Sequence, residues 1–196
     1  MKGVIESFEF LKGVPLANFV VVKSLKDLEK MPFPYYLKAD VSGHKTEMKA
    51  VIRCDNLKEA RKNFILLKKK FGRKMIIAQE TCHGLEMIVG IKEDVVFGKM
   101  LLVGFGGIFT EMKKDVSFRA LPVSRSEIKK MISELKGVDV LSARGKNYPI
   151  EKFYTIVEMI AHLAEKKDVK EMDLNPVILC EDCDCAKIVD ARVSLR

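Results

Sequence analysis

The first third of the chain changes from a helical to a strand-like spacing of apolar residues. Apolar residues three positions apart predict a short helix over 5–11. A valine-rich run at 17–23 predicts a buried strand. Apolar and polar residues then alternate at 35–41 and again at 47–54, so we expect two strands that pair as a hairpin.

A longer helix is predicted directly after this hairpin. Asp55 or Asn56 can cap its first turn, and apolar residues recur at helical spacing as far as Phe71. A helix beside a few strands makes a small α+β lobe, which we place at residues 17–75. The residues before it, 1–16, are expected to be an N-terminal helical segment.

The remaining chain, 76–196, predicts a second and larger lobe. Its strand-like runs lie at 74–80, 85–91 and 97–103, a further strand pair ends near Pro122, and two strands at 169–180 and 187–193 close the chain. One helix opens at a capping box that starts at Ser124, and another opens at Pro149. Strands follow strands instead of alternating with helices, so we expect an α+β fold of mostly antiparallel sheets with helices on one face.

Composition narrows the class of protein. The chain has 196 residues, of which 48% are hydrophobic, so it has enough apolar surface for a core and is not a disordered tail. No apolar run approaches the roughly 18–20 residues that span a bilayer, and no secretory signal is evident, so we expect a cytoplasmic protein. The net charge is 35 − 27 = +8, but the lysines are scattered without a nucleic-acid motif, which argues against nucleic-acid binding.

Oxygen-bearing side chains meet in the closing hairpin. Its turn is centred on residues 181–184, so paired positions add up to 365 and Asn175 faces Asp190. Asp173 lies two residues before Asn175 and therefore on the same face. Such a set suits Mg²⁺, which prefers oxygen ligands. The alternative is an ordinary solvated strand face, and a register slip of one residue would separate the pair.

The first hairpin carries cationic residues. Lys38 lies on the polar face of its strand, where it can hold a phosphate as a point charge or simply face water. The turn contains Gly43, His44 and Lys45, which suit a phosphate cradle, although an exposed turn is the commoner explanation. A histidine at this place can accept a phosphoryl group.

Two further carboxylates flank a strand junction. Glu80 ends one strand and Glu86 begins the next, where a carboxylate can accept hydrogen bonds from ribose hydroxyls or face water. The glycine cluster at 104–107 opens no predicted helix, so it does not fit the dinucleotide-binding fingerprint.

Three of the five cysteines crowd into six residues. Cys180, Cys183 and Cys185 have the spacing of a soft-metal site, but no fourth ligand is evident nearby in the sequence. We therefore interpret them as reduced thiols in a turn, the state expected in a cytoplasm.

Several segments together resemble a known family. The strings GFGGIFTEMKKDVSFRALPVS, EMDLNPVIL and IVDARV at 104–124, 171–179 and 188–193 are similar to the ATP-grasp subunit of ADP-forming acyl-CoA (acetyl-CoA) synthetases. The segments at 34–51 and 76–90 precede them in the same order. The β subunits of succinyl-CoA synthetases are more distant relatives. The resemblance implies an ATP-grasp fold, in which two α+β lobes enclose a nucleotide cleft.

The resemblance also assigns roles to residues. Lys38 matches a lysine that contacts ATP phosphates, and the turn of His44 and Lys45 matches one whose histidine relays phosphate. Gln79 and Glu80 match the hinge that receives the adenine amine. Nucleotide and ribose contacts are thus implied for Lys38, Gln79, Glu80 and Glu86.

The acidic segments carry the remaining implied roles. Asn175 and Asp190 match the Mg²⁺ ligands, with Asp173 in a supporting position. Glu111, Asp115 and Arg119 fall in the signature string at 104–124, and Arg119 is a candidate for phosphate contact. Catalytic roles are therefore implied for His44, Lys45 and Arg119.

The implied activity is that of an acid–thiol ligase subunit. It would bind Mg²⁺ with ADP or ATP and transfer phosphate between a phosphohistidine and ADP, with a separate CoA-binding α subunit as partner. One departure is clear, because the family's glycine pair after the His-Lys turn is replaced within 47–51 by residues with side chains. The alternative is therefore a non-catalytic nucleotide-binding module or regulatory subunit.

Overall fold

The computed structural model describes residues 2–41, 48–107, 115–143, 147–181 and 183–196. The chain divides into two compact units, which are considered separately. The small unit comprises Gly3–Ile5 and Ala17–Thr81, and the large unit comprises Lys2, Glu6–Leu16 and Cys82–Arg196. None of the helices among these residues has the length and apolar character needed to cross a membrane.

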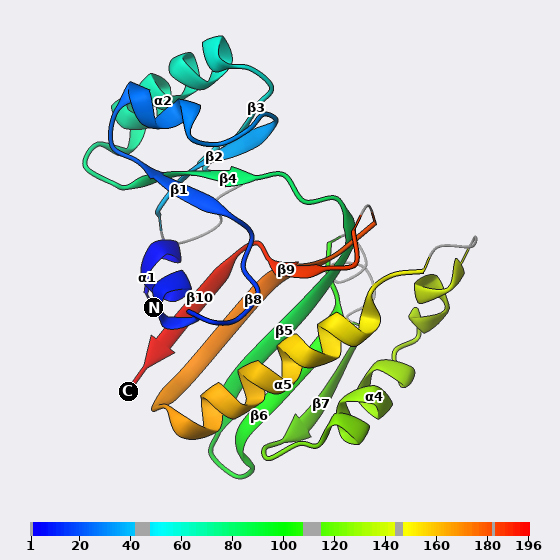
Figure 1. Cartoon of the computed structure of the whole chain (residues 1–196). Coiled ribbons are helices and arrows are strands. Elements are labelled where there is room, and N and C mark those ends of the chain that lie inside the picture. The colour runs from blue at the N-terminus through cyan, green and yellow to red at the C-terminus, as the bar shows by residue number, and fades with distance from the viewer. Residues whose placement is uncertain (1, 42–47, 108–114, 144–146, 182) are drawn as a thin grey trace. The chain divides into compact units, whose positions relative to one another are not determined.

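The small unit is a four-stranded antiparallel sheet with a helix on one face (Figure 1). Its strands are β1 (Phe19–Val22), β2 (Tyr35–Ala39), β3 (Val51–Cys54) and β4 (Ile76–Glu80), in the order β1-β4-β2-β3. A 3₁₀ helix, η1 (Leu25–Glu29), follows β1, and α2 (Leu57–Phe71) follows β3. The predicted hairpin of β2 and β3 is confirmed.

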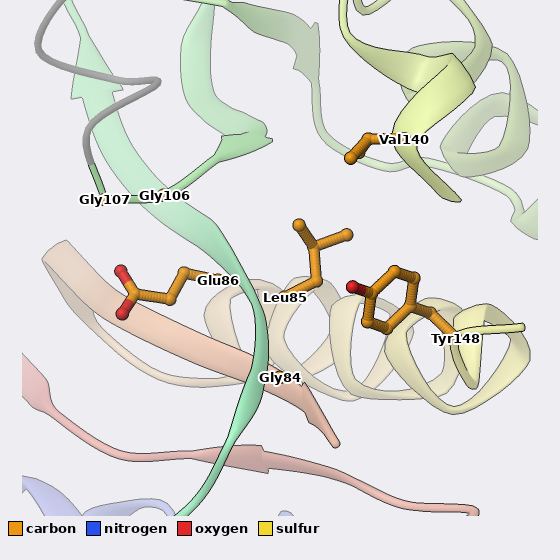
Figure 2. A pocket seen from close by; sticks show the side chains of 7 residues that line it. All are labelled: Gly84, Leu85, Glu86, Gly106, Gly107, Val140 and Tyr148. Atoms are coloured by element: carbon orange, nitrogen blue, oxygen red, sulfur yellow. The ribbon is translucent and has the colours of Figure 1, made fainter. Parts of the chain in front are cut away.

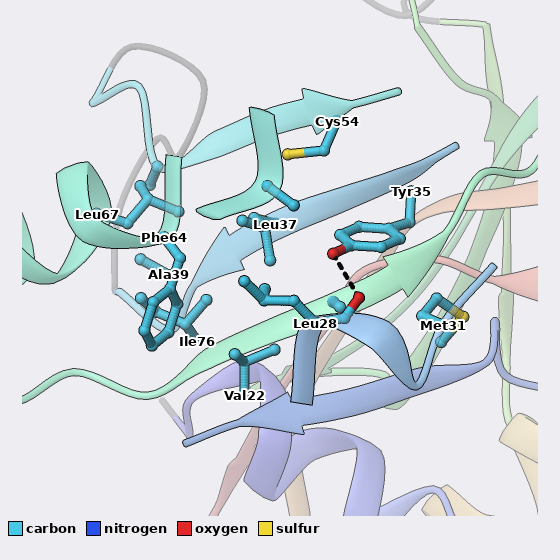
Figure 3. Packing of buried hydrophobic residues seen from close by; sticks show 13 residues of the cluster. Val22, Leu28, Met31, Tyr35, Leu37, Ala39, Cys54, Phe64, Leu67 and Ile76 are labelled. Carbon is cyan, nitrogen blue, oxygen red and sulfur yellow. Dashed lines mark hydrogen bonds between the residues drawn. The ribbon is translucent and has the colours of Figure 1, made fainter. Parts of the chain in front are cut away.

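The core of this unit lies between α2 and the sheet (Figure 3). Phe64 and Leu67 of α2 and Leu37 of β2 are buried there. The ring of Tyr35 is fully buried, and its hydroxyl donates a hydrogen bond to the carbonyl of Leu28 at 2.9 Å. Burial raises the pKa of Tyr35 to about 12. This packing fixes which face of β2 and β4 is turned away from α2.

The boundary that we predicted between the lobes at 75/76 is wrong by one strand. β4 lies between β1 and β2 in the small sheet, and its residues from Ile76 to Gln79 are all buried. Burial on both faces is typical of a central strand, but the local pattern does not tell which sheet the strand joins. The small unit accordingly continues to Thr81.

The large unit is a six-stranded antiparallel sheet covered on one face by α4 and α5 (Figure 1). Five of its strands follow the order β10-β8-β5-β6-β7. They are β10 (Ala191–Leu195), β8 (Val169–Cys180), β5 (Gly84–Asp94), β6 (Gly98–Phe105) and β7 (Val116–Ala120). The sixth strand, β9 (Ala186–Ile188), pairs with β8. The helices are α4 (Arg125–Ser133), η2 (Val138–Leu141), α5 (Ile150–Lys166) and the part of α1 (Val4–Phe10) that starts at Glu6. Mostly antiparallel sheets with helices on one face were predicted, and this is confirmed.

The apolar faces of these helices determine which face of the sheet they cover. In α5, Phe153, Ile156 and Ile160 are fully buried. The hydroxyl of Ser124 accepts a hydrogen bond from the backbone N–H of Glu127 at 3.2 Å and so caps α4, as the capping box predicted. The opposite face of the sheet carries the polar residues of β5 and β8.

Candidate functional site

Asn175 and Asp190 face each other at the junction of β8, β9 and β10. Val177 is paired with Ile188 in β9, and the same register continues into β10. Between these ladders the backbone N–H of Asn175 donates a hydrogen bond to the carbonyl of Asp190 at 3.2 Å. The predicted register is therefore confirmed.

The side chains of this pair lie on the face of the sheet turned away from α5. Met172 and Leu174 are buried, whereas Asp173 and Asn175 are exposed and Asp190 is half-buried. Residues that are directly opposite in an antiparallel pair share a face, so carboxylate and amide oxygens gather here. This donor set fits Mg²⁺, which takes carboxylate and amide oxygens and completes its shell with water or phosphate oxygens.

A pocket of about 390 Å³ lies beside the start of β5 (Figure 2). It is lined by Gly84, Leu85, Glu86, Gly106, Gly107, Val140 and Tyr148. Its lining side chains are apolar apart from the exposed carboxylate of Glu86 and the hydroxyl of Tyr148. Such a pocket can hold a flat apolar ring while the carboxylate accepts hydrogen bonds from hydroxyl groups.

Glycine lets the backbone approach the carboxylate of Glu86. Gly107 has φ +61°, and a Cβ atom there would lie 2.8 Å from a carboxylate oxygen of Glu86. The N–H of Gly106 donates to the carbonyl of Glu86 at 2.7 Å. A side chain at Gly107 would therefore be strained and would obstruct the carboxylate.

In the small unit, Lys38 and Gln79 share the face of the sheet that is turned away from α2. Leu37 of β2 and Ala78 of β4 belong to the core beneath α2, and their strand neighbours Lys38 and Gln79 therefore face the other way. Lys38 is 8% exposed and lies opposite Ile77. This face thus carries a nearly buried cation on a central strand.

Gln79 is fully buried, yet neither its amide nitrogen nor its amide oxygen has a hydrogen-bond partner among the residues that the structure describes. An unpaired buried amide costs about 1–3 kcal/mol, so proteins rarely keep one without a function. The amide offers one donor and one acceptor group, which suits a polar ligand such as a nucleobase.

Glu80 has a different environment. Its carboxylate accepts hydrogen bonds from the backbone N–H of Asn18 at 2.7 Å and from the amide nitrogen of Asn18 at 3.1 Å. Its own N–H donates to the carbonyl of Asn18 at 3.0 Å. These bonds join β4 to the residue before β1, so the side chain of Glu80 has a structural partner, and its contact with adenine stays a prediction.

Arg119 also has structural partners. It lies on β7, and its guanidinium donates to the carboxylates of Glu127 at 3.3 Å and Glu134 and to the hydroxyl of Ser117 at 3.3 Å. The Arg119 hydrogen bond lowers the pKa of Glu134, with a smaller effect from Ser117. The two carboxylates give Arg119 a structural role, and its contact with phosphate stays a prediction.

We expect Arg119→Gln to lower the melting temperature at pH 7 by about 2–4 °C, because two carboxylates lose their cation. The pKa of Glu134 is lowered in the folded protein, so this contribution is present above its ordinary pKa of about 4.3 and is lost in stronger acid. Melting curves of both proteins across pH measure the difference. Arg53→Gln, which breaks an exposed pair with Asp55, is the control. If Mg·ADP no longer raises the melting temperature of Arg119→Gln, the result would support the predicted contact between Arg119 and phosphate.

Some predicted residues lie outside the part that the structure describes. These are His44, Lys45 and Glu111.

Other residues of the site were missed by sequence reasoning. Tyr148, whose hydroxyl donates to Glu181 at 3.1 Å, comes from the segment before α5, far in sequence from Glu86. The glycine cluster at 104–107 was noticed, but its place beside Glu86 needed the pairing of β5 with β6.

Comparison with known proteins agrees with this architecture. The family described as ATP-grasp domain matches residues 11–195. Acetate–CoA ligase [ADP-forming] I subunit beta of Pyrococcus furiosus is 35% identical, over 97% of this chain and 90% of that protein. The II subunit beta of the same organism is 37% identical over 62% of this chain, and the chain spans about half of that relative, 53%.

A solved structure is similar over the whole chain. Acetyl-coenzyme A synthetase 1 of Ca. Korarchaeum cryptofilum, in complex with coenzyme A and Ca-AMPCP, has 28% identity and a TM-score of 0.90, with 100% of this chain and 93% of that chain covered. The family match covers residues 11–195, and the structural similarity extends over the whole chain. The chain belongs to the ATP-grasp domain family.

Proposed function

We propose that this chain is the nucleotide-binding subunit of an ADP-forming acyl-CoA synthetase, an acid–thiol ligase. The net reaction is acyl-CoA + ADP + phosphate giving carboxylic acid, CoA and ATP. The observation that carries the proposal is the pairing of Asn175 with Asp190 on one face of the sheet. The similarity to acetate–CoA ligase β subunits supports the class of reaction.

In this proposal Asn175 and Asp190 hold Mg²⁺, with Asp173 beside them. A cation held there would supply positive charge that offsets the charge on the phosphate oxygens. Asp190 is kept in place because one of its carboxylate oxygens accepts the N–H of Ala191 at 3.0 Å. The chain thereby positions the ligands before any nucleotide binds.

The other residues bind and orient the nucleotide. Glu86 accepts hydrogen bonds from the ribose hydroxyls, Gln79 bonds to the base, and Lys38 places its charge near the phosphates. His44 accepts or relays the phosphoryl group with Lys45 beside it, as the resemblance implies. In the step that makes ATP, the P–N bond of a phosphohistidine breaks and a terminal oxygen of ADP forms the new P–O bond.

The proposal requires a second subunit. The part of this chain that the structure describes contains no strand, glycine-rich turn and helix in the order that binds a dinucleotide-like cofactor. Acyl transfer and CoA binding are therefore assigned to a CoA-binding α subunit, which also carries the first phosphohistidine. The acyl specificity lies with that subunit.

The test combines this chain with the CoA-binding subunit that we expect to co-purify with it from the source organism. With acetyl-CoA, ADP, phosphate and Mg²⁺, we expect ATP to form at a rate that depends on both subunits. Luciferase luminescence measures the ATP, and omission of either subunit or of phosphate is the control. Binding of Mg·ADP without any ATP formation with a panel of acyl-CoA substrates would contradict the proposal.

That contradicting outcome defines the alternative, a nucleotide-binding module that does not turn over. It is favoured by the absence of the family's glycine pair after the His-Lys turn. In the structure Lys49 has φ +50°, a left-handed conformation that costs a residue with a side chain about 1–2 kcal/mol. The chain therefore keeps a glycine-like backbone here at a cost in stability, which is why we prefer the catalytic reading.

A further inference from the structure

Sulfur and imidazole groups are concentrated at one end of the β8–β9 hairpin. Cys180 ends β8, and Cys183 and Cys185 lie in the turn that leads to β9. Cys82 and His83 directly precede β5, whose Gly84 is paired with Cys180. Four of the five cysteines and one of the three histidines of the chain therefore belong to these two adjoining segments.

The three thiols of the hairpin converge. The sulfur atoms of Cys180, Cys183 and Cys185 all lie within 4.8 Å of one another. The N–H of Cys180 donates to the carbonyl of Cys185 at 3.0 Å, so these two residues close the turn. Thiolates bound to a tetrahedral cation at about 2.3 Å lie about 3.8 Å apart, which a group of this size accommodates with small side-chain movements.

The neighbouring strand brings the backbone of the Cys82–His83 segment against the turn, although the group of converging ligand atoms comprises the three thiols alone. The N–H of Glu181 donates to the carbonyl of His83 at 3.1 Å, which holds the segment of Cys82 and His83 against the hairpin turn. A tetrahedral site of three thiolates needs one more thiolate or imidazole, and a side-chain movement of Cys82 or His83 would supply it.

The surroundings favour a cation. The turn carries the carboxylates of Glu181 and Asp184, the first bonded to Tyr148 and the second paired with Lys152 at 3.4 Å. Cys183 is exposed, which gives an ion access from solvent. Cys183 and Cys185 are joined as a disulfide here, but a bridge between residues only two positions apart closes too short a loop to stabilise the fold appreciably.

We propose that, in the reduced protein, the thiolates of Cys180, Cys183 and Cys185 bind a thiophilic divalent cation of the zinc class, with a side chain of the Cys82–His83 segment as the fourth ligand. Thiolate ligands select such a cation, whereas the oxygen ligands Asn175 and Asp190 suit Mg²⁺. This site is therefore separate from the magnesium site that the proposed function needs. Because Glu181 also bonds to Tyr148, the cation would brace one wall of the pocket beside Glu86.

The test uses the full chain, reduced with a thiol-free reductant and supplied with Zn²⁺. We expect one zinc per chain by mass spectrometry of the metal, and a higher melting temperature than after removal of the metal by a chelator. Substitution by Co²⁺ should give the intense thiolate-to-metal charge-transfer bands that report sulfur ligands. Reduced protein that binds no zinc, or Co²⁺ spectra without these bands, would overturn the proposal.

Matched variants locate the ligands. Cys183→Ser and Cys185→Ser should each weaken zinc binding by more than the roughly 10–100-fold that loss of an outer hydrogen-bond partner costs. Cys54→Ala, which changes the one cysteine in the small unit, should retain one zinc. Unchanged affinity in either serine variant would refute the site.

Two more variants complete the design. The double variant Cys82→Ser, His83→Asn should also bind zinc more weakly, and unchanged affinity there would refute the fourth ligand. Asp190→Ala should keep its zinc, so a failure of this proposal is distinguishable from a failure of the magnesium site.

Discussion

Replacing Asp190 with alanine lowers the rate of ATP formation by about 100- to 1000-fold, since a lost metal ligand removes several kcal/mol of transition-state stabilisation. The same change removes the stabilisation of the chain by Mg·ADP. Both effects follow from the position of Asp190 directly opposite Asn175. With one oxygen ligand left in the pair, the cation is no longer held against the phosphates.

The stability measurement separates binding from turnover. A nucleotide present at about 100 times its dissociation constant stabilises the folded state by about 2.7 kcal/mol. For a chain of this size that is a rise of about 5–10 °C in the melting temperature. We expect the wild-type chain to show this rise with Mg·ADP, and Asp190→Ala to show almost none.

A matched control lies on the same strand. Glu171→Ala removes a carboxylate from β8, four residues before Asn175, at a position opposite Lys92 of β5 in the strand register. This variant should keep the Mg·ADP shift and most of the rate. If Asp190→Ala retains both the shift and the rate, the magnesium ligands lie elsewhere.

The position of this pair could be predicted because a hairpin register follows from its turn. Once residues 181–184 form the turn, every paired position is determined, and the alternation of the strand assigns the face. The same local reasoning predicted the cap of α4 and the buried side of α5. Patterns within single segments were therefore enough to predict most helices and strands and the positions of the proposed magnesium ligands Asn175 and Asp190.

Contacts between distant segments could not be predicted in this way. The signature string suggested that Arg119 contacts phosphate, but its guanidinium is bound by Glu127 and Glu134, which come from a helix and its end. The sequence separation between a strand and the following helix does not determine which of their charged side chains come into contact. Tyr148 and Gly107 likewise reach the pocket beside Glu86 only through the packing of separate elements.

Replacing Gln79 with leucine is the second change with a large expected effect, because it should raise the stability of the chain and lower its affinity for Mg·ADP. Gln79→Leu should raise the melting temperature of the ligand-free chain by several degrees, because it removes a buried amide whose lack of partners costs about 1–3 kcal/mol. It should also weaken Mg·ADP binding by about tenfold, the equivalent of about 1.4 kcal/mol, since the hydrogen bonds to the base are lost.

A partnered amide of the same unit serves as the control. Asn63→Leu removes an amide that donates to the sulfur of Cys54 at 3.5 Å, so it should not stabilise the chain and should leave Mg·ADP affinity unchanged. Calorimetric titration and melting curves measure the two quantities for each variant. A Gln79→Leu protein that is less stable and binds Mg·ADP normally would assign the amide to the fold. A more stable protein that binds Mg·ADP weakly shows that the small unit keeps an unfavourable group because the ligand satisfies it.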